Sequence, residues 1–226
     1  LFHAPFIACH PGINLYAIWE RSKELSRMHY PEVIVYRTYE ELLADKSIDL
    51  VIVNTPSFTH YEYAKAALAA QKNVIVEKPF TDTVDQAKEL ALLADAQGVK
   101  LSVFQNRRWD SDFKTVRSIL DSGFLGTLLE AEFHYDRFNL ALSPKTHKET
   151  PGPAVGVLYD LGPHLIDQAV SLFNMPDKVF ADVMITRPES KVDDYFEILM
   201  MYPKLRVRLK SSYWVKEPAP SYQLYG

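Results

Sequence analysis

Residues 73–82 read NVIVEKPFTD, and this stretch decides the fold. The β-branched run Val74–Val76 favours a buried strand, which Lys78 and Pro79 bring to an end. Thr81 or Asp82 then offers an N-cap for a predicted helix over 83–97, and Gly98 is suited to end that helix. The stretch therefore predicts one strand–turn–helix unit of a parallel sheet.

Similar units lie on both sides of this stretch. The pattern predicts strands over 14–19, 33–35, 49–53 and 100–104, and helices over 39–44 and 60–70. After Asp49, the predicted strand over 49–53 is continuously apolar, as in a strand buried on both faces of a parallel sheet. Because strands and helices alternate, we expect an α/β fold with a Rossmann-type, doubly wound parallel sheet.

The pattern changes after about residue 107. Long alternating runs over 128–138, 178–186, 195–202 and 205–213 predict strands, and helices are expected over 113–122 and 155–173. Tight turns such as Tyr202-Pro203-Lys204 favour antiparallel pairing. We therefore predict a dinucleotide-binding domain over 1–106, followed by an α+β domain over 107–226 with a large open, mainly antiparallel sheet.

Composition excludes several classes of function. The 226-residue chain has a net charge of −4, so it lacks the basic field that holds nucleic acid or an anionic membrane. No run approaches the ~20 apolar residues of a membrane span. Cys9 is the only cysteine, which favours a reducing, cytoplasmic setting. The histidines show no metal-ligand spacing, and we predict no metal.

Lys78 is the first candidate for chemistry. Ligands bind in the crevice outside the carboxyl ends of parallel strands, where Lys78 falls. Pro79 keeps the preceding lysine extended, and partial desolvation there lowers a lysine pKa and suits it to proton transfer. The alternative is a surface lysine in a strand–helix loop.

Asp160 and His164 are the second candidates. They stand four residues apart in a predicted helix, so both side chains share one face. A carboxylate beside an imidazole raises the basicity of the imidazole and fixes its orientation. The alternative is that Asp160 stabilises the helix dipole and that His164 is unrelated.

Together these residues carry a resemblance. Glu77-Lys78-Pro79 after a strand, with the run YDLGPHLID over 159–167, resembles the glucose–fructose oxidoreductase / inositol dehydrogenase / rhizopine catabolism (Gfo/Idh/MocA) family. The similarity covers nearly the whole chain. Further matches over 54–60 and 106–110 make it resemble most the branch that contains NADP-dependent scyllo-inositol dehydrogenases.

The resemblance implies roles for the site residues. Lys78 contacts the nicotinamide ribose and the substrate hydroxyl, His164 is the general acid/base, and Asp160 positions the substrate or tunes His164. Which of Lys78 and His164 is the principal proton acceptor varies among relatives. The Lys78–Pro79 peptide is expected to be cis. The implied cofactor-binding residues also include Thr55, Pro56, His60 and Glu77.

Further residues are predicted at the site. Asn106 and Trp109 follow a predicted strand end, and we assign Asn106 to the cofactor and Trp109 to the substrate. Arg137 lies on the long strand over 128–138 and is predicted to reach the substrate. The alternative for Arg137 is packing and solvation on the strand.

The choice between NAD and NADP stays open, with a slight lean to NADP. An acidic residue at the end of the second strand binds the ribose hydroxyls of NAD, whereas an arginine accommodates the NADP phosphate. Glu20 could bind the ribose hydroxyls of NAD, and Arg21 with Ser22 could bind the phosphate of NADP. Arg21 matches the related branch. The alternative is that Arg21 and Lys23 are solvated loop charges.

The family's first strand and Gly-rich phosphate loop are absent from this sequence. The segment 1–6 resembles the helix after that loop, and 222–226 reads as a strand entering a turn. We therefore expect further sequence at both ends.

The resulting hypothesis is an NAD(P)-dependent dehydrogenase. It transfers a hydride between a secondary alcohol of a sugar or inositol-like cyclic polyol and the nicotinamide. The alternatives are an NAD-dependent redox glycosidase of the same fold and a non-enzymatic dinucleotide-sensing protein. Since exposed sheet faces and edges invite association, a homodimer or homotetramer through the open sheet is expected.

Overall fold

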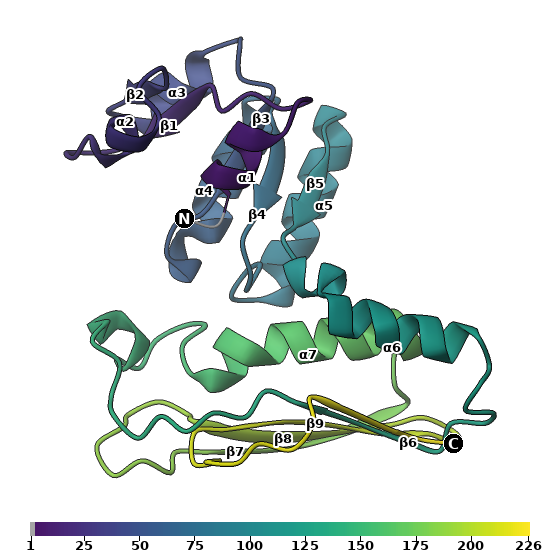
Figure 1. Ribbon diagram of the computed structural model, residues 1–226. Helices are drawn as coiled ribbons and strands as arrows, with labels where there is room; N and C mark the ends of the chain where they lie inside the picture. Colours follow the sequence, from purple (N-terminus) through teal and green to yellow (C-terminus); the bar gives the residue numbers. More distant parts are fainter. Residues whose placement is uncertain (1–2) are drawn as a thin grey trace. The chain divides into compact units, whose positions relative to one another are not determined.

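The computed structural model describes residues 3–226, with the backbone alone at His147, and divides into two compact units (Figure 1). The first unit holds the chain up to Thr55, with Thr59–Val76 and Val84–Ser102. The second holds Pro56–Phe58, Glu77–Thr83 and Val103–Gly226. Lys78 therefore groups with the second unit, although it stands only two residues after a strand of the first.

The strands β1 to β4 of the first unit pair in parallel, as predicted. Their bounds are β1 Ala17–Trp19 with β2 Ile34–Tyr36, and β3 Leu50–Val53 with β4 Asn73–Val76. β5 (Leu101–Val103) lies on the other side of β4. In β3 and β4 the buried residues alternate with half-buried ones, except that Leu50 is exposed. The Rossmann-type expectation is confirmed, with the strands in two sheets rather than one.

The helices of the first unit are short except for the last two. They are α1 Ala4–Cys9, α2 Leu25–His29, α3 Tyr39–Ala44, α4 His60–Ala69 and α5 Val84–Gln97. α3 begins where predicted, because Thr38 and Glu41 form a capping box. Trp19 of β1 packs against the rings of Tyr39 and Tyr63, with centroids 5.2 Å away in each case. This aromatic cluster holds β1 against α3 and α4.

The second unit contains a five-stranded sheet in the order β10-β6-β9-β8-β7. The β6–β9 pair is parallel and the other pairs are antiparallel, which confirms the predicted mainly antiparallel sheet. The bounds are β6 Glu130–His134, β7 Lys178–Met184, β8 Tyr195–Met201, β9 Arg206–Ser212 and β10 Tyr222–Tyr225. β6 is shorter than the predicted strand over 128–138, so Arg137 lies beyond the strand on which it was predicted, and Phe138 forms an isolated bridge to Trp214.

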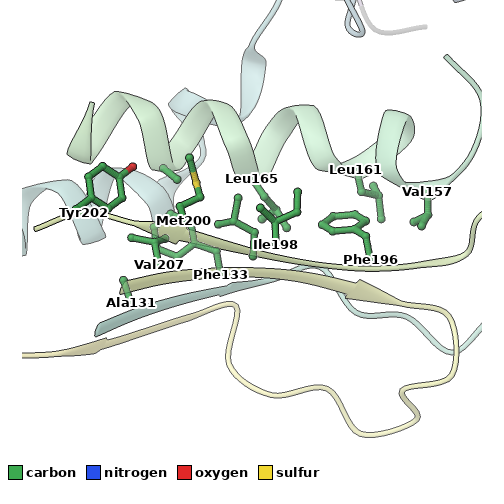
Figure 2. Close-up of a cluster of buried hydrophobic side chains, with 12 residues drawn as sticks. Ala131, Phe133, Val157, Leu161, Leu165, Phe196, Ile198, Met200, Tyr202 and Val207 are labelled. Carbon is green, nitrogen blue, oxygen red and sulfur yellow. The ribbon is translucent and has the colours of Figure 1, made fainter. Parts of the chain in front are cut away.

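Helix α7 (Val157–Phe173) lies along one face of this sheet (Figure 1). Leu161 and Leu165 of the helix meet Phe133 and Phe196 of the strands in a buried apolar cluster (Figure 2). Burial of apolar side chains on one sheet face is the main stabilising term here. The edge strand β7 is exposed along its whole length, and Phe180 on it is 60% exposed.

The remaining short elements connect these parts. They are η1 Ser57–Thr59, η2 Asn106–Trp109, α6 Ser111–Asp121 and η3 Thr146–Lys148. The Lys78–Pro79 peptide is cis, as the resemblance implies. Across residues 3–226, no helix has the length and apolarity needed to cross a membrane.

Candidate active site

Lys78 and Asp160 meet in the second unit. The Lys78 ammonium donates to the backbone carbonyl of Asp160 at 2.8 Å and to its Oδ1 at 3.2 Å. The side chains are only 20% and 31% exposed. The two residues selected separately from the sequence therefore form one half-buried, charge-assisted pair.

The start of α7 fixes where Asp160 points. Asp193, in the loop before β8, accepts the Leu158 N–H through Oδ2 at 2.7 Å, and its carbonyl accepts the Val157 N–H at 2.9 Å. Gly156 stands before the helix with φ +106°, and a Cβ there would lie 1.9 Å from Asp193. Only glycine fits this approach, which places Asp160 in the first helical turn.

A second lysine, which the sequence analysis did not select, also pairs with Asp160. Lys148 Nζ from η3 lies 3.1 Å from Asp160 Oδ2. Burial alone would raise the pKa of Asp160, but Lys78 and Lys148 beside it hold that pKa below its ordinary value. Asp160 is therefore a carboxylate shared by two ammonium groups. No local pattern around Lys148 distinguishes it from other loop lysines.

His164 corrects one expectation. It is 5% exposed, and burial together with the charges of Lys78 and Arg107 lowers its pKa from 6.5 to about 4. The effect of Asp160 is to raise this pKa, as predicted, but the effect is outweighed. The Nδ1 of His164 is buried and has no hydrogen-bond partner in the described part of the chain, so Asp160 does not orient the ring through it. His164 is a neutral imidazole at neutral pH.

A cavity of about 650 Å³ opens beside the ion pair within the second unit. Lys78, Arg137, Lys148 and Asp160 are among the residues that line it, as is Pro56. Such a volume is typical of small-molecule sites. His164, Asn106 and Trp109 are not on its wall, and Trp109 is 77% exposed. The substrate role of Trp109 and the cofactor role of Asn106 stay predictions.

A buried network holds the loop that carries Lys148. Arg187 is 3% exposed; its Nε donates to Asp194 at 2.8 Å and its NH2 donates to Glu149 at 3.1 Å. NH1 of Arg187 also donates to the carbonyl of Ala141 at 2.9 Å. Both ends of the loop over 141–149 are thereby fixed to the residues between β7 and β8. No local pattern predicts this network, because Ala141 and Glu149 lie 46 and 38 positions before Arg187 in the chain.

Two family models match the chain. The model of the oxidoreductase family with an NAD-binding Rossmann fold matches residues 1–105, and that of the GFO/IDH/MocA C-terminal domain matches residues 113–226. This chain belongs to the Gfo/Idh/MocA family. The two matched segments correspond to the Rossmann-type unit and to the unit built on the five-stranded sheet.

Three relatives illustrate the similarity. The chain is 42% identical to the uncharacterized oxidoreductase YdgJ of Escherichia coli, over all of this chain and 65% of YdgJ. It is 37% identical to the scyllo-inositol 2-dehydrogenase (NADP⁺) IolW of Bacillus subtilis, over all of this chain and 63% of IolW. An oxidoreductase crystal structure from Bacillus cereus superposes with TM-score 0.90 at 36% identity, over 99% of this chain and 64% of that one. The chain thus spans less than two thirds of the length of these relatives.

The Gfo/Idh/MocA residues predicted at the cofactor lie partly in the first unit. His60, 1% exposed, has Nε2 2.9 Å from the Thr55 carbonyl, and the hydroxyls of Thr55 and Thr59 are 2.8 Å apart. These contacts join Thr55, in the turn after β3, to the start of α4. In the second unit the Lys78 N–H donates to Glu77 Oε2 at 3.2 Å.

Glu20 directly follows β1 and fits a dinucleotide ribose. Its Oε1 accepts the Ser26 N–H at 3.1 Å, while its Oε2 is buried and has no hydrogen-bond partner in the part of the chain described. At the carboxyl end of a parallel strand, a carboxylate oxygen with no hydrogen-bond partner in the described chain can accept a hydrogen bond from a ribose hydroxyl. Arg21 and Ser22 are exposed in the same loop. Of the described residues, no three His, Cys, Asp or Glu side chains gather as a metal-binding group.

Proposed function

We propose that this protein is an NAD(P)-dependent dehydrogenase acting on a secondary alcohol of a sugar or inositol-like cyclic polyol. The observation that carries the proposal is the Lys78–Asp160 pair on the wall of a cavity of about 650 Å³. A bound nicotinamide supplies the acceptor or donor of the hydride. The chain supplies the groups that bind the substrate hydroxyl and move its proton.

Lys78 is the residue we assign to the hydroxyl. Its ammonium group is held by two oxygens of Asp160 and keeps further donor capacity for a substrate oxygen on the cavity side. An ammonium beside that oxygen stabilises the negative charge that develops as its proton leaves. Asp160 is assigned to positioning, since its carboxylate fixes Lys78 and Lys148 together.

His164 is assigned a proton-accepting role. Since its pKa is lowered to about 4, the imidazole is neutral at physiological pH and has a basic nitrogen to offer. It is buried one helical turn beyond Asp160 and outside the cavity wall, so we propose that Lys78 relays the proton: the ammonium passes one of its protons to His164 as it takes up the proton of the substrate hydroxyl. In this scheme both Lys78 and His164, the two residues that the family resemblance implies in proton transfer, take part.

For the cofactor we propose NAD(P) with a slight lean to NADP. The relative IolW is named as NADP-dependent, and Arg21 and Ser22 stand exposed where the second phosphate is expected. The orphaned Glu20 Oε2 is the feature that favours NAD. Thr55, Pro56, His60, Glu77 and Asn106 remain the other proposed cofactor residues.

A homodimer or homotetramer formed through the open sheet and a cytoplasmic location also belong to the proposal. The exposed apolar side chains of β7, among them Phe180, support association through this sheet.

The test uses the full-length protein. Nicotinamide reduction is followed with scyllo-inositol, myo-inositol and glucose, with NAD and NADP in parallel. Lys78→Ala is expected to lower kcat by about 10²- to 10⁴-fold, which is the usual contribution of acid–base groups. Lys88→Ala, at an exposed position of α5, is the matched control.

Three outcomes contradict the proposal. Unchanged turnover in Lys78→Ala removes that residue from the chemistry. Release of free sugar from a glycoside, with no net change in cofactor, indicates the redox glycosidase. Dinucleotide binding without turnover of any polyol indicates the sensing protein.

A further inference from the structure

We infer that the substrate is a polyol or sugar bearing an oxyanion group, a carboxylate or a phosphate, and that Arg137 binds this group. The inference rests on the proposed function, because it names the substrate class of the same cavity. It is carried by the position of Arg137, by the charges around it and by the geometry of its guanidinium.

Arg137 is placed firmly on the cavity wall. Its backbone N–H donates to the Ser212 carbonyl at 2.8 Å, and its carbonyl accepts the Val215 N–H at 3.0 Å. The main chain at Arg137 is thus fixed against the end of β9, while the side chain lines the same cavity as Lys78 and Asp160. The side chain itself is exposed, so its guanidinium is accessible to a ligand that enters the cavity.

The other basic groups of the cavity already have carboxylate partners. Lys78 and Lys148 share Asp160, and Arg187 is bound by Asp194 and Glu149. In contrast, the guanidinium of Arg137 has no hydrogen-bond or ion-pair partner among the residues that the structure describes.

Each acidic group of the cavity already has another partner, so none of them pairs with Arg137. Asp160 forms ion pairs with two lysines, and Glu149 is bound to Arg187 and to the Ser143 N–H at 2.7 Å. The last carboxyl, Asp193, accepts the Leu158 N–H at the start of α7, and burial raises its pKa. The positive charge of Arg137 is therefore available to a ligand.

A guanidinium recognises oxyanions specifically. Its planar pairs of N–H groups match the two oxygens of a carboxylate or phosphate, and such charge-assisted bonds are about twice as strong as those to neutral acceptors. A polyol hydroxyl offers neither the charge nor the paired geometry. The cavity wall therefore combines a hydroxyl-binding group, Lys78, with an oxyanion-binding group, Arg137.

The experiment compares matched ligands on the full-length protein loaded with NADP or NAD. D-glucuronate is paired with its neutral amide, and glucose 6-phosphate with glucose, so the two arms separate carboxylate from phosphate. Both kcat/KM and the calorimetric Kd are measured. We expect at least one oxyanion to exceed its neutral partner by about 10- to 100-fold, as for hydrogen bonds to charged groups.

Arg137→Met is expected to bring this ratio close to one. Lys145→Met removes an equal charge from an exposed position of the same surface loop that does not line the cavity, and it should leave the ratio unchanged. An equal ratio in wild type and Arg137→Met overturns the inference, as does the absence of binding by either oxyanion.

The two proposals fail separately. Oxidation of glucose or inositol without any preference for the oxyanions refutes the inference and leaves the dehydrogenase intact. Arg137-dependent binding of an oxyanion without turnover refutes the dehydrogenase and leaves the binding site intact.

Discussion

The Lys78 ammonium lies within hydrogen-bond distance of two oxygens of Asp160, its carbonyl at 2.8 Å and its carboxylate at 3.2 Å, although 82 positions separate the two residues. This contact joins the second residue after β4 to the first turn of α7. Because the backbone oxygen is one of the acceptors, the contact depends on the helix as well as on the side chain.

Removing the charge of Asp160 should therefore impair turnover without abolishing it. In Asp160→Asn the carbonyl still accepts from Lys78, but the lysine loses its counter-ion. We expect kcat to fall by roughly 10- to 100-fold, since small misplacements of a reacting group have effects of this order. Asp167→Asn lies on the same helix, where Asp167 pairs with Arg108, and should leave kcat unchanged in steady-state assays. Equal kcat values in the two variants would contradict this role.

His164 should make the fold sensitive to acid. Its pKa is lowered from 6.5 to about 4, so between these values the unfolded chain binds more protons than the folded one. The stabilisation is complete above pH 6.5 and is lost as the pH falls to about 4. Over this range the free energy of unfolding of wild type should drop by roughly 3 kcal/mol relative to His164→Gln. Urea unfolding at several pH values measures this, and a pH-independent difference would sink the prediction.

His134 should have the opposite dependence. Its ring nitrogens lie 3.2 Å from Asp136 and 3.1 Å from Glu132, and these carboxylates, Asp136 first, raise its pKa against the effect of burial. The stabilisation is present below the ordinary histidine pKa and is lost as the pH rises through the raised one. His134→Gln should thus cost more stability at pH 5.5 than at pH 9, by the same urea measurement. Asp136→Asn should weaken this dependence.

Asp194 should be among the most sensitive positions for stability. It is fully buried and accepts from Thr186 N at 2.7 Å and from Arg187 Nε at 2.8 Å. Asp194→Asn leaves a buried guanidinium with one carboxylate fewer, and breaking such a pair costs about 3–5 kcal/mol. Glu89→Gln, in an exposed pair with Lys65, should cost less than about 1 kcal/mol. Equal losses in chemical denaturation would contradict the burial argument.

Much of the fold was predictable because it depends on local patterns. The strand at Asn73–Val76 and the helix at Tyr39–Ala44 have the predicted bounds, since β-branched runs and a capping box act on neighbouring residues. Helix α2 was not predicted. It has one buried residue, Ser26, whose N–H donates to the side chain of Glu20 six positions earlier.

The amino-acid sequence by itself determined the α/β and open-sheet classes and the selection of Lys78 and Asp160, because the strand and helix motifs that contain them are local features. Only the tertiary structure decided that Lys148 joins Asp160, that Arg187 holds the loop and that His164 is neutral. The physical reason is that a charge or a pKa depends on what lies within a few ångströms. At this site those neighbours come from segments far apart in the chain, and folding alone brings them together.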